Sequence, residues 1–283
     1  MPKKKKPHKR SSPAASGIAS TLRRTAVWLL TAGAISIQAT SCGFLPAPSQ
    51  PSSPSIERSG SNVATHFSDC RQFFAAGVTP SVRKAPMQRE LCYEAFAILH
   101  SGESRTPVFV AERLNRASVE DANENRTNKF FADARLPRSE RAELSDYKGS
   151  GYARGHMAPA GDMPSPTAMA QSFSLANMVP QNAKQNSGAW AKIEQDTRRY
   201  VLRAKGDVFV ITGPVFGPDS QTVGANRVRV PTHLFKLVYD VSTGKAWAHW
   251  QPNSEDARAG RPISYDELAQ RIGMELLPGV ELR

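Results

Sequence analysis

Apolar residues in this chain gather into short runs separated by polar and glycine-rich stretches. Short runs that are rich in β-branched or aromatic residues and bounded by turn signals are typical of β-strands. The first run is also compatible with a helix, and residues 242–245 predict a turn between the last two. The predicted strands span residues 91–99, 107–112, 172–179, 208–211, 234–241 and 246–250.

The segment 189–204 has a helical period instead. Its apolar positions recur at steps of three and four residues, so they share one face of a helix. These positions are Trp190, Ile193, Thr197, Tyr200, Val201 and Ala204. A last helix is predicted to start at Ser264, with Glu267 completing a capping box. Strands with interspersed helices predict an α+β fold, with a mixed, mainly antiparallel sheet and flanking helices.

Between these elements, residues 114–148 are polar and rich in Asn, Arg and Asp. They predict an irregular surface excursion. Connections of this length without regular structure are uncommon unless they serve a function.

Residues 1–42 are typical of an export signal. Eight of the 37 Lys and Arg lie here without any acidic residue, and an apolar stretch at 26–37 follows them. The stretch is shorter than the roughly 20 residues of a membrane span. The remaining 29 basic and 25 acidic residues give only +4 of the formal +12 charge, so bulk charge is weak evidence for a polyanionic partner.

Three interpretations of this signal are open. The small residues before Cys42 resemble the end of a bacterial lipoprotein signal, although Ala39 stands where such signals usually have Leu. A lipidated Cys42 would anchor the protein to a membrane. Simple cleavage near the same place is an equal alternative, and an uncleaved anchor is a third. We therefore expect an exported protein, which is periplasmic, a membrane-anchored lipoprotein or secreted.

Residues 43–65 form a Pro/Ser-rich linker that lacks the apolar surface needed to fold, so we expect one folded domain at 66–283. Once Cys42 is removed or lipidated, Cys70 and Cys92 form a pair. In an oxidising compartment these two residues are expected to form a disulfide, with two buried free thiols as the alternative. The cysteines do not have the spacing of a zinc site.

The stretch 149–162 carries the chemistry of interest. Its glycines predict tight turns with few side chains in the way, and an extended backbone would place Arg154 and His156 on the same side. His accepts a proton near neutral pH, and Arg holds a phosphate through its planar fork. Taken alone, a glycine-rich loop with a surface Arg and a hydrogen-bonded His is the simpler interpretation.

A second block begins at the predicted helix. Asn186 stands at the helix entrance and Glu194 lies two turns further on, which brings both side chains toward one side. An Asn oxygen is a hard neutral ligand that suits Mg²⁺. The alternatives are a helix cap for Asn186 and a solvated surface charge for Glu194.

Together the two blocks resemble the DNA/RNA non-specific endonuclease family of the ββα-metal (His-Me finger) type, which includes secreted bacterial nucleases and endonuclease G. Three motifs agree with that family in order and spacing. They are Arg154-Gly155-His156, Asn177-Met178-Val179-Pro180-Gln181, and Asn186-Ser187-Gly188-Ala189-Trp190 followed by Glu194. The resemblance covers residues 85–280 and implies a ββα-metal active-site motif.

The resemblance implies a metal-dependent endonuclease that hydrolyses DNA and RNA with little sequence preference. His156 would be the general base, and Asn186 would hold one Mg²⁺, with Mn²⁺ as a substitute. Glu194 would orient the metal's waters, and Asn177 would support His156 or its loop. Arg126 is the expected counterpart of the family's upstream arginine, in competition with Arg135 and Arg138. Arg154 would either bind the phosphate or have a structural role.

One position departs from the family pattern, because Ala153 stands where the family has Asp. This departure motivates a first alternative, a weakened or inactive homologue that still binds nucleic acid. A phosphodiesterase that acts on another substrate is the second alternative.

Overall fold

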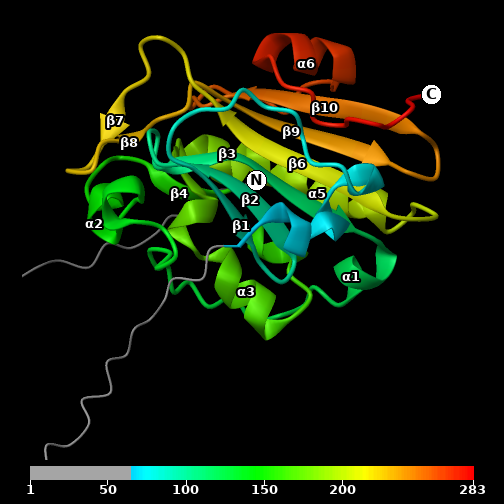
Figure 1. Cartoon of the computed structure of the whole chain (residues 1–283), viewed down its shortest axis with the longest axis horizontal. Helices are drawn as coiled ribbons and strands as arrows, with labels where there is room; N and C mark the ends of the chain where they lie inside the picture. The colour runs from blue at the N-terminus through cyan, green and yellow to red at the C-terminus, as the bar shows by residue number, and fades with distance from the viewer. Residues whose placement is uncertain (1–64) are drawn as a thin grey trace, which may run out of the picture. The chain divides into compact units, whose positions relative to one another are not determined.

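The computed structural model describes residues 65–283, and its centre is one seven-stranded sheet (Figure 1). Every strand pair in this sheet is antiparallel, which confirms the predicted α+β class. Across the sheet the strands are β1 (Gln88–Cys92), β2 (Phe96–Ser101), β3 (Thr106–Leu114), β6 (Val208–Val215), β9 (His233–Asp240), β10 (Lys245–Pro252) and β11 (Ile263–Ser264).

Alternation along the strands divides the core between the two faces of the sheet. On β9, Phe235 and Leu237 face the side that α6 (Tyr265–Ile272) covers with Leu268. Short 3₁₀ turns between residues 67 and 77 pack on this same face, as Figure 1 shows. Ser264 caps α6 through a bond from the Glu267 amide at 3.1 Å, but the Glu267 carboxylate pairs with Arg271 rather than closing a capping box.

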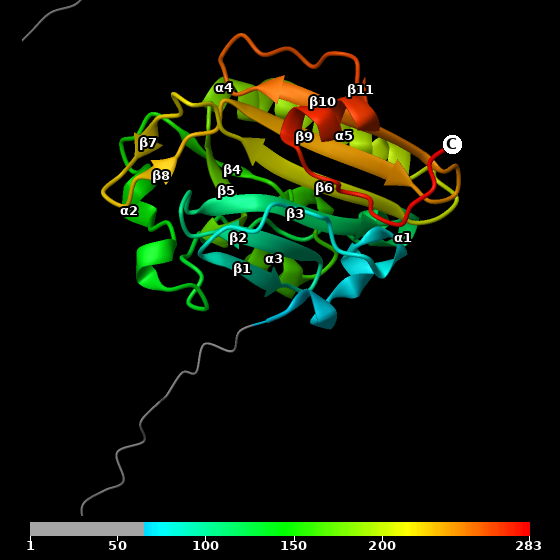
Figure 2. The same ribbon diagram turned by 45° about the horizontal axis from the view of Figure 1, so that its top comes forward.

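The opposite face of the sheet carries the helices α3 (Pro166–Ser172) and α5 (Ala191–Val201), with α3 beneath β1 and β2 in Figure 2. Trp190 is fully buried there and marks the entry to α5. A separate antiparallel pair lies beside this face, formed by β4 (Ala153–His156) and β5 (Met178–Gln181). The chain runs from β5 through α4 (Ala183–Gln185) and the π-helical turn η7 (Asn186–Trp190) into α5. This order of two strands and a helix is that of the predicted ββα motif.

Two predicted strands were wrong in extent. The run 91–99 is the turn of a β1–β2 hairpin rather than one strand, because residues 93–95 reverse the chain. The run 172–179 ends α3 and passes through a 3₁₀ turn before β5 starts at Met178. In both places the apolar side chains are buried as predicted, but the direction of the backbone depends on contacts with distant strands.

After the end of β3 at Leu114, the excursion 114–148 contains only short helices, as its polar composition predicts. They are α1 (Arg116–Glu120), the 3₁₀ turn Arg138–Glu140 and α2 (Leu144–Tyr147). A small hairpin of β7 (Thr222–Val223) and β8 (Val228–Arg229) lies further along the chain. The predicted signal at 1–42 and nearly all of the linker lie outside the described residues. Thr65 already bonds to β1 through the Glu90 carbonyl at 3.1 Å. Within residues 65–283, no helix has the length and apolar character to cross a membrane.

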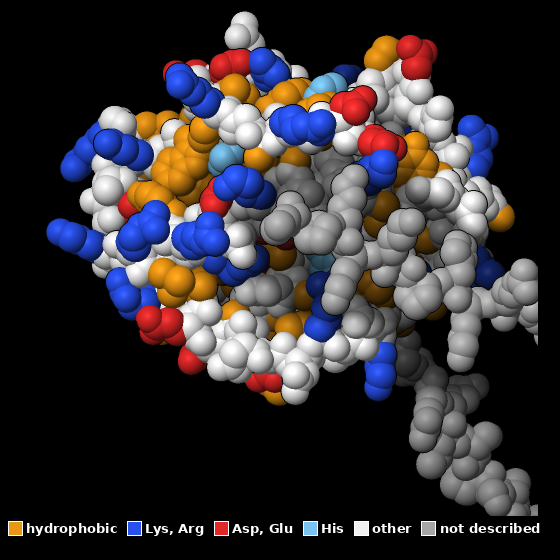
Figure 3. Space-filling model, turned by 180° about the vertical axis from the view of Figure 1, so that it is seen from behind, with side chains coloured by type: hydrophobic (Ala, Val, Ile, Leu, Met, Phe, Trp, Pro, Cys, Tyr) orange, Lys and Arg blue, Asp and Glu red, His pale blue; other side chains and the backbone are white. Residues whose placement is uncertain are grey.

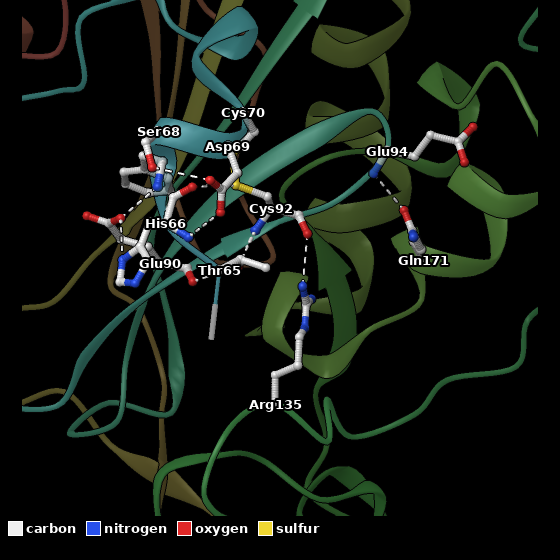
Figure 4. Close-up of a disulfide and its surroundings, with 11 residues drawn as sticks. Thr65, His66, Ser68, Asp69, Cys70, Glu90, Cys92, Glu94, Arg135 and Gln171 are labelled. Carbon is white, nitrogen blue, oxygen red and sulfur yellow. Dashed lines mark hydrogen bonds and ion pairs between the residues drawn. A yellow bond between two sulfur atoms is a disulfide. The ribbon is translucent and has the colours of Figure 1, made fainter. Parts of the chain in front are cut away.

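A disulfide joins Cys70 to Cys92, so the pair forms the predicted bond (Figure 4). It ties the N-terminal turns to the end of β1, where the Thr65 hydroxyl accepts the Cys92 amide at 3.0 Å. The Cys92 carbonyl in turn accepts a bond from Arg135 at 2.8 Å, and the Glu94 amide donates to Gln171 at 2.8 Å. The β1–β2 turn thus anchors both the N-terminal turns and the polar excursion.

Removing this disulfide is expected to lower the free energy of unfolding by about 3 kcal/mol, because the bond closes a 22-residue separation in the unfolded chain. Urea unfolding followed by tryptophan fluorescence, with and without dithiothreitol, measures the loss. The Cys70→Ser/Cys92→Ser protein serves as the control, since its unfolding midpoint should not respond to the reductant. An unchanged midpoint for the reduced wild-type protein would contradict the prediction.

Candidate active site

His156 ends β4, and Arg154 lies two residues before it on the same face of the strand. Both side chains contact the ring of Phe130, which shows that they share a face. The Phe130 ring centroid lies 4.1 Å from the Arg154 guanidinium carbon and 5.9 Å from the His156 ring centroid. The extended conformation predicted for this segment is therefore present. Between the two residues, Gly155 packs directly on Gln181 of β5, where an added Cβ would lie 2.6 Å from the Gln181 Cβ.

The His156 ring is buried among aromatic and cationic side chains. Phe173 meets it edge to face at 5.1 Å, and the ring nitrogen Nε2 has no hydrogen-bond partner within residues 65–283. Burial lowers the pKa of His156 to about 3, with the positive charges of Arg126 and Arg154 acting in the same direction. His156 is consequently neutral at physiological pH, in the form that accepts a proton.

Asn177 holds the backbone that follows His156. Its Oδ1 accepts the Ala158 amide at 2.9 Å, and its Nδ2 donates to the carbonyls of Ala158 and Ser172, both at 2.9 Å. The Met157 amide also bonds to the Asn177 carbonyl at 3.0 Å. This fully buried side chain therefore fixes the direction in which the chain leaves β4.

The helix cap lies at Asn182 rather than at Asn186. The Asn182 Oδ1 accepts the amides of Lys184 at 3.0 Å and Gln185 at 3.1 Å. Asn186 instead has helical backbone angles and begins the π-helical turn. The capping interpretation of Asn186 is wrong for this reason, and its side chain is half-buried without a capping duty. π-Helical turns inside α-helices frequently mark functional sites.

Glu194 lies in the first turn of α5 and is half-buried rather than a solvated surface charge. Burial raises its pKa to about 7, an effect that Lys236 opposes and Asp162 reinforces. Arg198 and Arg126 add further opposing positive charge. A carboxyl that changes charge near neutral pH is characteristic of functional sites.

Two arginines approach the histidine from different segments. Arg126 comes from the polar excursion, its guanidinium carbon lies 5.2 Å from the Phe173 ring centroid, and its Nε donates to Asn128 at 2.8 Å. Arg154 comes from β4 and its Nε is buried without a partner in the described part of the chain. Arg135, one of the two competing candidates, is instead held by Asp133, which its Nη2 contacts at 2.7 Å. Arg138, the other candidate, is exposed in the 3₁₀ turn Arg138–Glu140. The structure thus brings Arg126, and not Arg135, to His156.

Asn186 offers a neutral side-chain oxygen, and this is the kind of ligand to which a hydrated metal ion can bind. Within residues 65–283, no group of three or more His, Cys, Asp and Glu side chains is placed to hold a metal. A site of this kind would have to rely on a neutral oxygen such as that of Asn186, with most ligands supplied by water, which is how Mg²⁺ commonly binds. Glu194, in the first turn of the α5 helix that follows, carries a carboxylate of the kind that accepts hydrogen bonds from such waters.

Sequence reasoning missed the charges packed beneath Glu194. Lys236 is 1% exposed and Glu112 is fully buried. A signal was present, because both residues occupy core-facing positions of otherwise apolar strands. Glu112 lies between Val110 and Leu114 in the alternation of β3, where an apolar residue is expected.

Comparison with known proteins identifies the family of this chain. Residues 76–281 match the DNA/RNA non-specific endonuclease family, so the chain belongs to that family. In a solved structure of the EndoG/EndoGI complex, which concerns the mechanism of EndoG inhibition, one chain superposes with a TM-score of 0.61 at 25% identity. The match covers 68% of this chain and 86% of that one.

Three curated relatives illustrate the range of similarity. Mitochondrial nuclease EXOG of Xenopus laevis is 38% identical over 52% of this chain and 44% of its own length. Mitochondrial endonuclease G of Homo sapiens is 33% identical over 51% of this chain and 52% of its own length. The mitochondrial nuclease of Saccharomyces cerevisiae is 29% identical over 80% of this chain and 76% of its own length. The matched segment thus spans less than half of the EXOG relatives.

Gly155→Ala is expected to destabilise the fold by about 1–3 kcal/mol, because the new methyl group overlaps Gln181 and forces β4 and β5 apart. Thermal unfolding measures the change. Gly260→Ala is the matched control, since an added Cβ at Gly260 meets no atom within 4 Å. Equal unfolding temperatures for the two variants would show that the close approach of β4 to β5 does not require glycine.

Proposed function

We propose that this protein is a metal-dependent endonuclease that hydrolyses phosphodiester bonds of DNA and RNA with little sequence preference. The observation that carries the proposal is the neutral, buried His156 between Arg126 and Arg154, on the strand pair that leads into the Asn186 turn. A base, two cations for phosphate and a hard oxygen ligand are the groups that phosphodiester hydrolysis needs. Family membership supports the same reaction.

In this mechanism, His156 accepts a proton on its unprotonated ring nitrogen from a water that attacks phosphorus in line. The low pKa of His156 keeps that nitrogen free of a proton at neutral pH. The backbone after His156 is fixed by Asn177, so the ring keeps its orientation between Phe130 and Phe173 during proton transfer.

Arg126 and Arg154 would place positive charge beside a phosphate bound at His156. Both arginines are close enough to His156 for their charges to lower its pKa. Arg126 is exposed and can follow a substrate, whereas Arg154 is held over the Phe130 ring. Asn186 would bind the divalent cation directly and Glu194 would hold its waters; Mg²⁺ is our candidate, with Mn²⁺ as a substitute. When bound, the ion supplies Lewis-acid stabilisation of the charge that builds up on phosphate oxygens.

The breadth of substrate follows from what these groups contact. Phosphate and metal contacts carry no base sequence information, so a site built from them cuts DNA and RNA alike. Figure 3 shows the side opposite to Figure 1, where Lys and Arg side chains gather over the left part of the described surface. Such a surface attracts a polyanion despite the low net charge outside residues 1–42.

A plasmid-nicking assay with Mg²⁺ tests the proposal. His156→Ala is expected to lower the nicking rate by about 10²–10⁴-fold, because a general base contributes about that much. Asn186→Ala should lose activity together with metal affinity, which Mn²⁺ titration reads directly. The matched controls are His66→Ala and Asn123→Ala, both at exposed positions, and these variants should keep the wild-type rate.

The same assay separates the alternatives. Wild-type protein that binds DNA in the presence of EDTA but nicks none with Mg²⁺ would be the inactive homologue that Ala153 suggests. Protein that hydrolyses model diesters but leaves DNA and RNA intact would be a phosphodiesterase of another substrate class. Either result would overturn the proposed nuclease.

We also propose that the chain is exported, on the basis of the basic and apolar segments in residues 1–42. The Cys70–Cys92 disulfide supports a location outside a reducing cytosol. Several relatives are named as mitochondrial proteins, whereas the proposal for this chain is export from the cell. The state of the N-terminus is therefore the feature to measure.

Mass spectrometry of the mature N-terminus tests export. Cleavage directly before Cys42 with an added lipid mass is expected for the lipoprotein, and an unmodified new N-terminus near residue 42 for simple cleavage. Export would be refuted by an intact Met1 in the soluble cytosolic fraction.

A further inference from the structure

Five charged side chains are gathered where α5 packs on the sheet. Glu112 on β3 and Lys236 on β9 point from the sheet, and Glu194 and Arg198 come from α5. Asp162 ends the 3₁₀ turn Ala160–Asp162 that follows β4. Glu112, Lys236 and Asp162 are between 0% and 3% exposed. We call these five residues the α5 charge cluster. It contains Glu194, which is part of the proposed active site, and four residues to which the proposed mechanism gives no role.

Within residues 65–283, the hydrogen bonds and ion pairs of the α5 charge cluster leave Glu112 without a partner. Arg198 contacts Asp162 at 2.8 Å, and Lys236 donates to the Thr212 hydroxyl at 2.8 Å. Neither carboxyl oxygen of Glu112 has a hydrogen-bond partner in the described part of the chain. A fully buried carboxylate without donors is strongly disfavoured as an ion, so Glu112 is stable there in its neutral form.

The sum of charges leads to the same conclusion. With three acids and two bases, the α5 charge cluster would carry one excess negative charge if every member were ionised. A single proton makes it neutral, and the buried, unpartnered Glu112 is the member best placed to hold that proton. Glu194 is then the carboxyl that can ionise next to the proposed metal site.

An apolar residue would fill the Glu112 position at lower cost, since Val110 and Leu114 already line the same face of β3. The acid therefore has a purpose other than packing. We propose that Glu112 is a positioning residue for the nuclease reaction, which holds a proton while the metal site is empty and releases it when a divalent cation binds near Glu194. This inference rests on the proposed function.

The groups that face Glu112 determine whether its carboxyl keeps or releases a proton. Burial raises the pKa of Glu112 well above its usual value, and the charges of Asp162 and Glu194 raise it further. Lys236 and Arg198 oppose the rise. His249 lies across from Lys236 on β10, and its pKa is lowered to about 4, so it adds no charge at neutral pH. A divalent cation adds positive charge near Glu194, which favours the ionised form of Glu112.

Calorimetric titration with Mn²⁺ in two buffers of different ionisation enthalpy measures the protons released on binding, without reference to catalysis. The Glu112→Gln protein is expected to release at least about two-fold fewer protons than wild type. Glu140→Gln is the matched control, because Glu140 is another buried carboxyl but is paired with Arg89 outside the α5 charge cluster. This control should release the wild-type number.

The pH profile of nicking supplies a second readout that a purely structural role would not move. Activity requires ionised Glu194, whose pKa is about 7, so the rate falls as the pH drops through that value. Because Glu112 has released its proton in the metal-loaded protein, Glu112→Gln removes a negative charge that competes with Glu194 there, and it should move this acidic limb down by about one pH unit. Lys236→Met removes a positive charge and should move it up.

The outcomes are distinct. Wild-type protein that neither binds Mn²⁺ nor cuts DNA would refute the proposed function itself. Wild-type protein that cuts DNA, combined with a Glu112→Gln variant of unchanged proton release and unchanged acidic limb, would overturn the role of Glu112 alone. Thermal unfolding confirms that each variant is folded, and the Glu112→Gln result is sufficient if Lys236→Met does not fold.

Discussion

The proposed active site depends on the antiparallel pairing of β4 with β5. That pairing sets Arg154 and His156 on one face, and Gly155 allows it because only hydrogen fits against Gln181. Asn177 then locks the exit of β4 with three side-chain bonds to the backbone. The chain continues from β5 through α4 into the Asn186 turn and α5, so the same strand pair determines where the proposed metal ligand and Glu194 lie.

Burial acts on the two titrating groups of the site in opposite directions. Desolvation disfavours whichever form carries charge, so it lowers the pKa of His156 and raises the pKa of Glu194. The histidine is thereby kept as a neutral base, while the carboxyl becomes responsive to nearby charges near pH 7. The aromatic rings around His156 and the sheet packed against Glu194 therefore set the pKa values of these two groups as well as forming part of the core.

The large sheet serves as a rigid support with two different faces. One face carries α6 and the disulfide-linked N-terminal turns, and its packing is almost wholly apolar. The other face buries Lys236 and Glu112 under α5, which raises the cost of folding at the place where chemistry is proposed. Departures from simple core packing concentrate at functional sites in this way.

The sequence by itself determined the family, the α+β class, the order of the three motifs and the identity of His156, Asn186 and Glu194 as candidates. These features are local, because residue type, spacing and periodicity encode them directly. The tertiary structure decided the hairpin within 91–99, the start of β5 at Met178, the cap at Asn182 and the approach of Arg126 to His156. Each depends on which distant residues approach. The α5 charge cluster is the clearest case, since its members are scattered between residues 112 and 236 and become one electrostatic unit only when the sheet and α5 pack together.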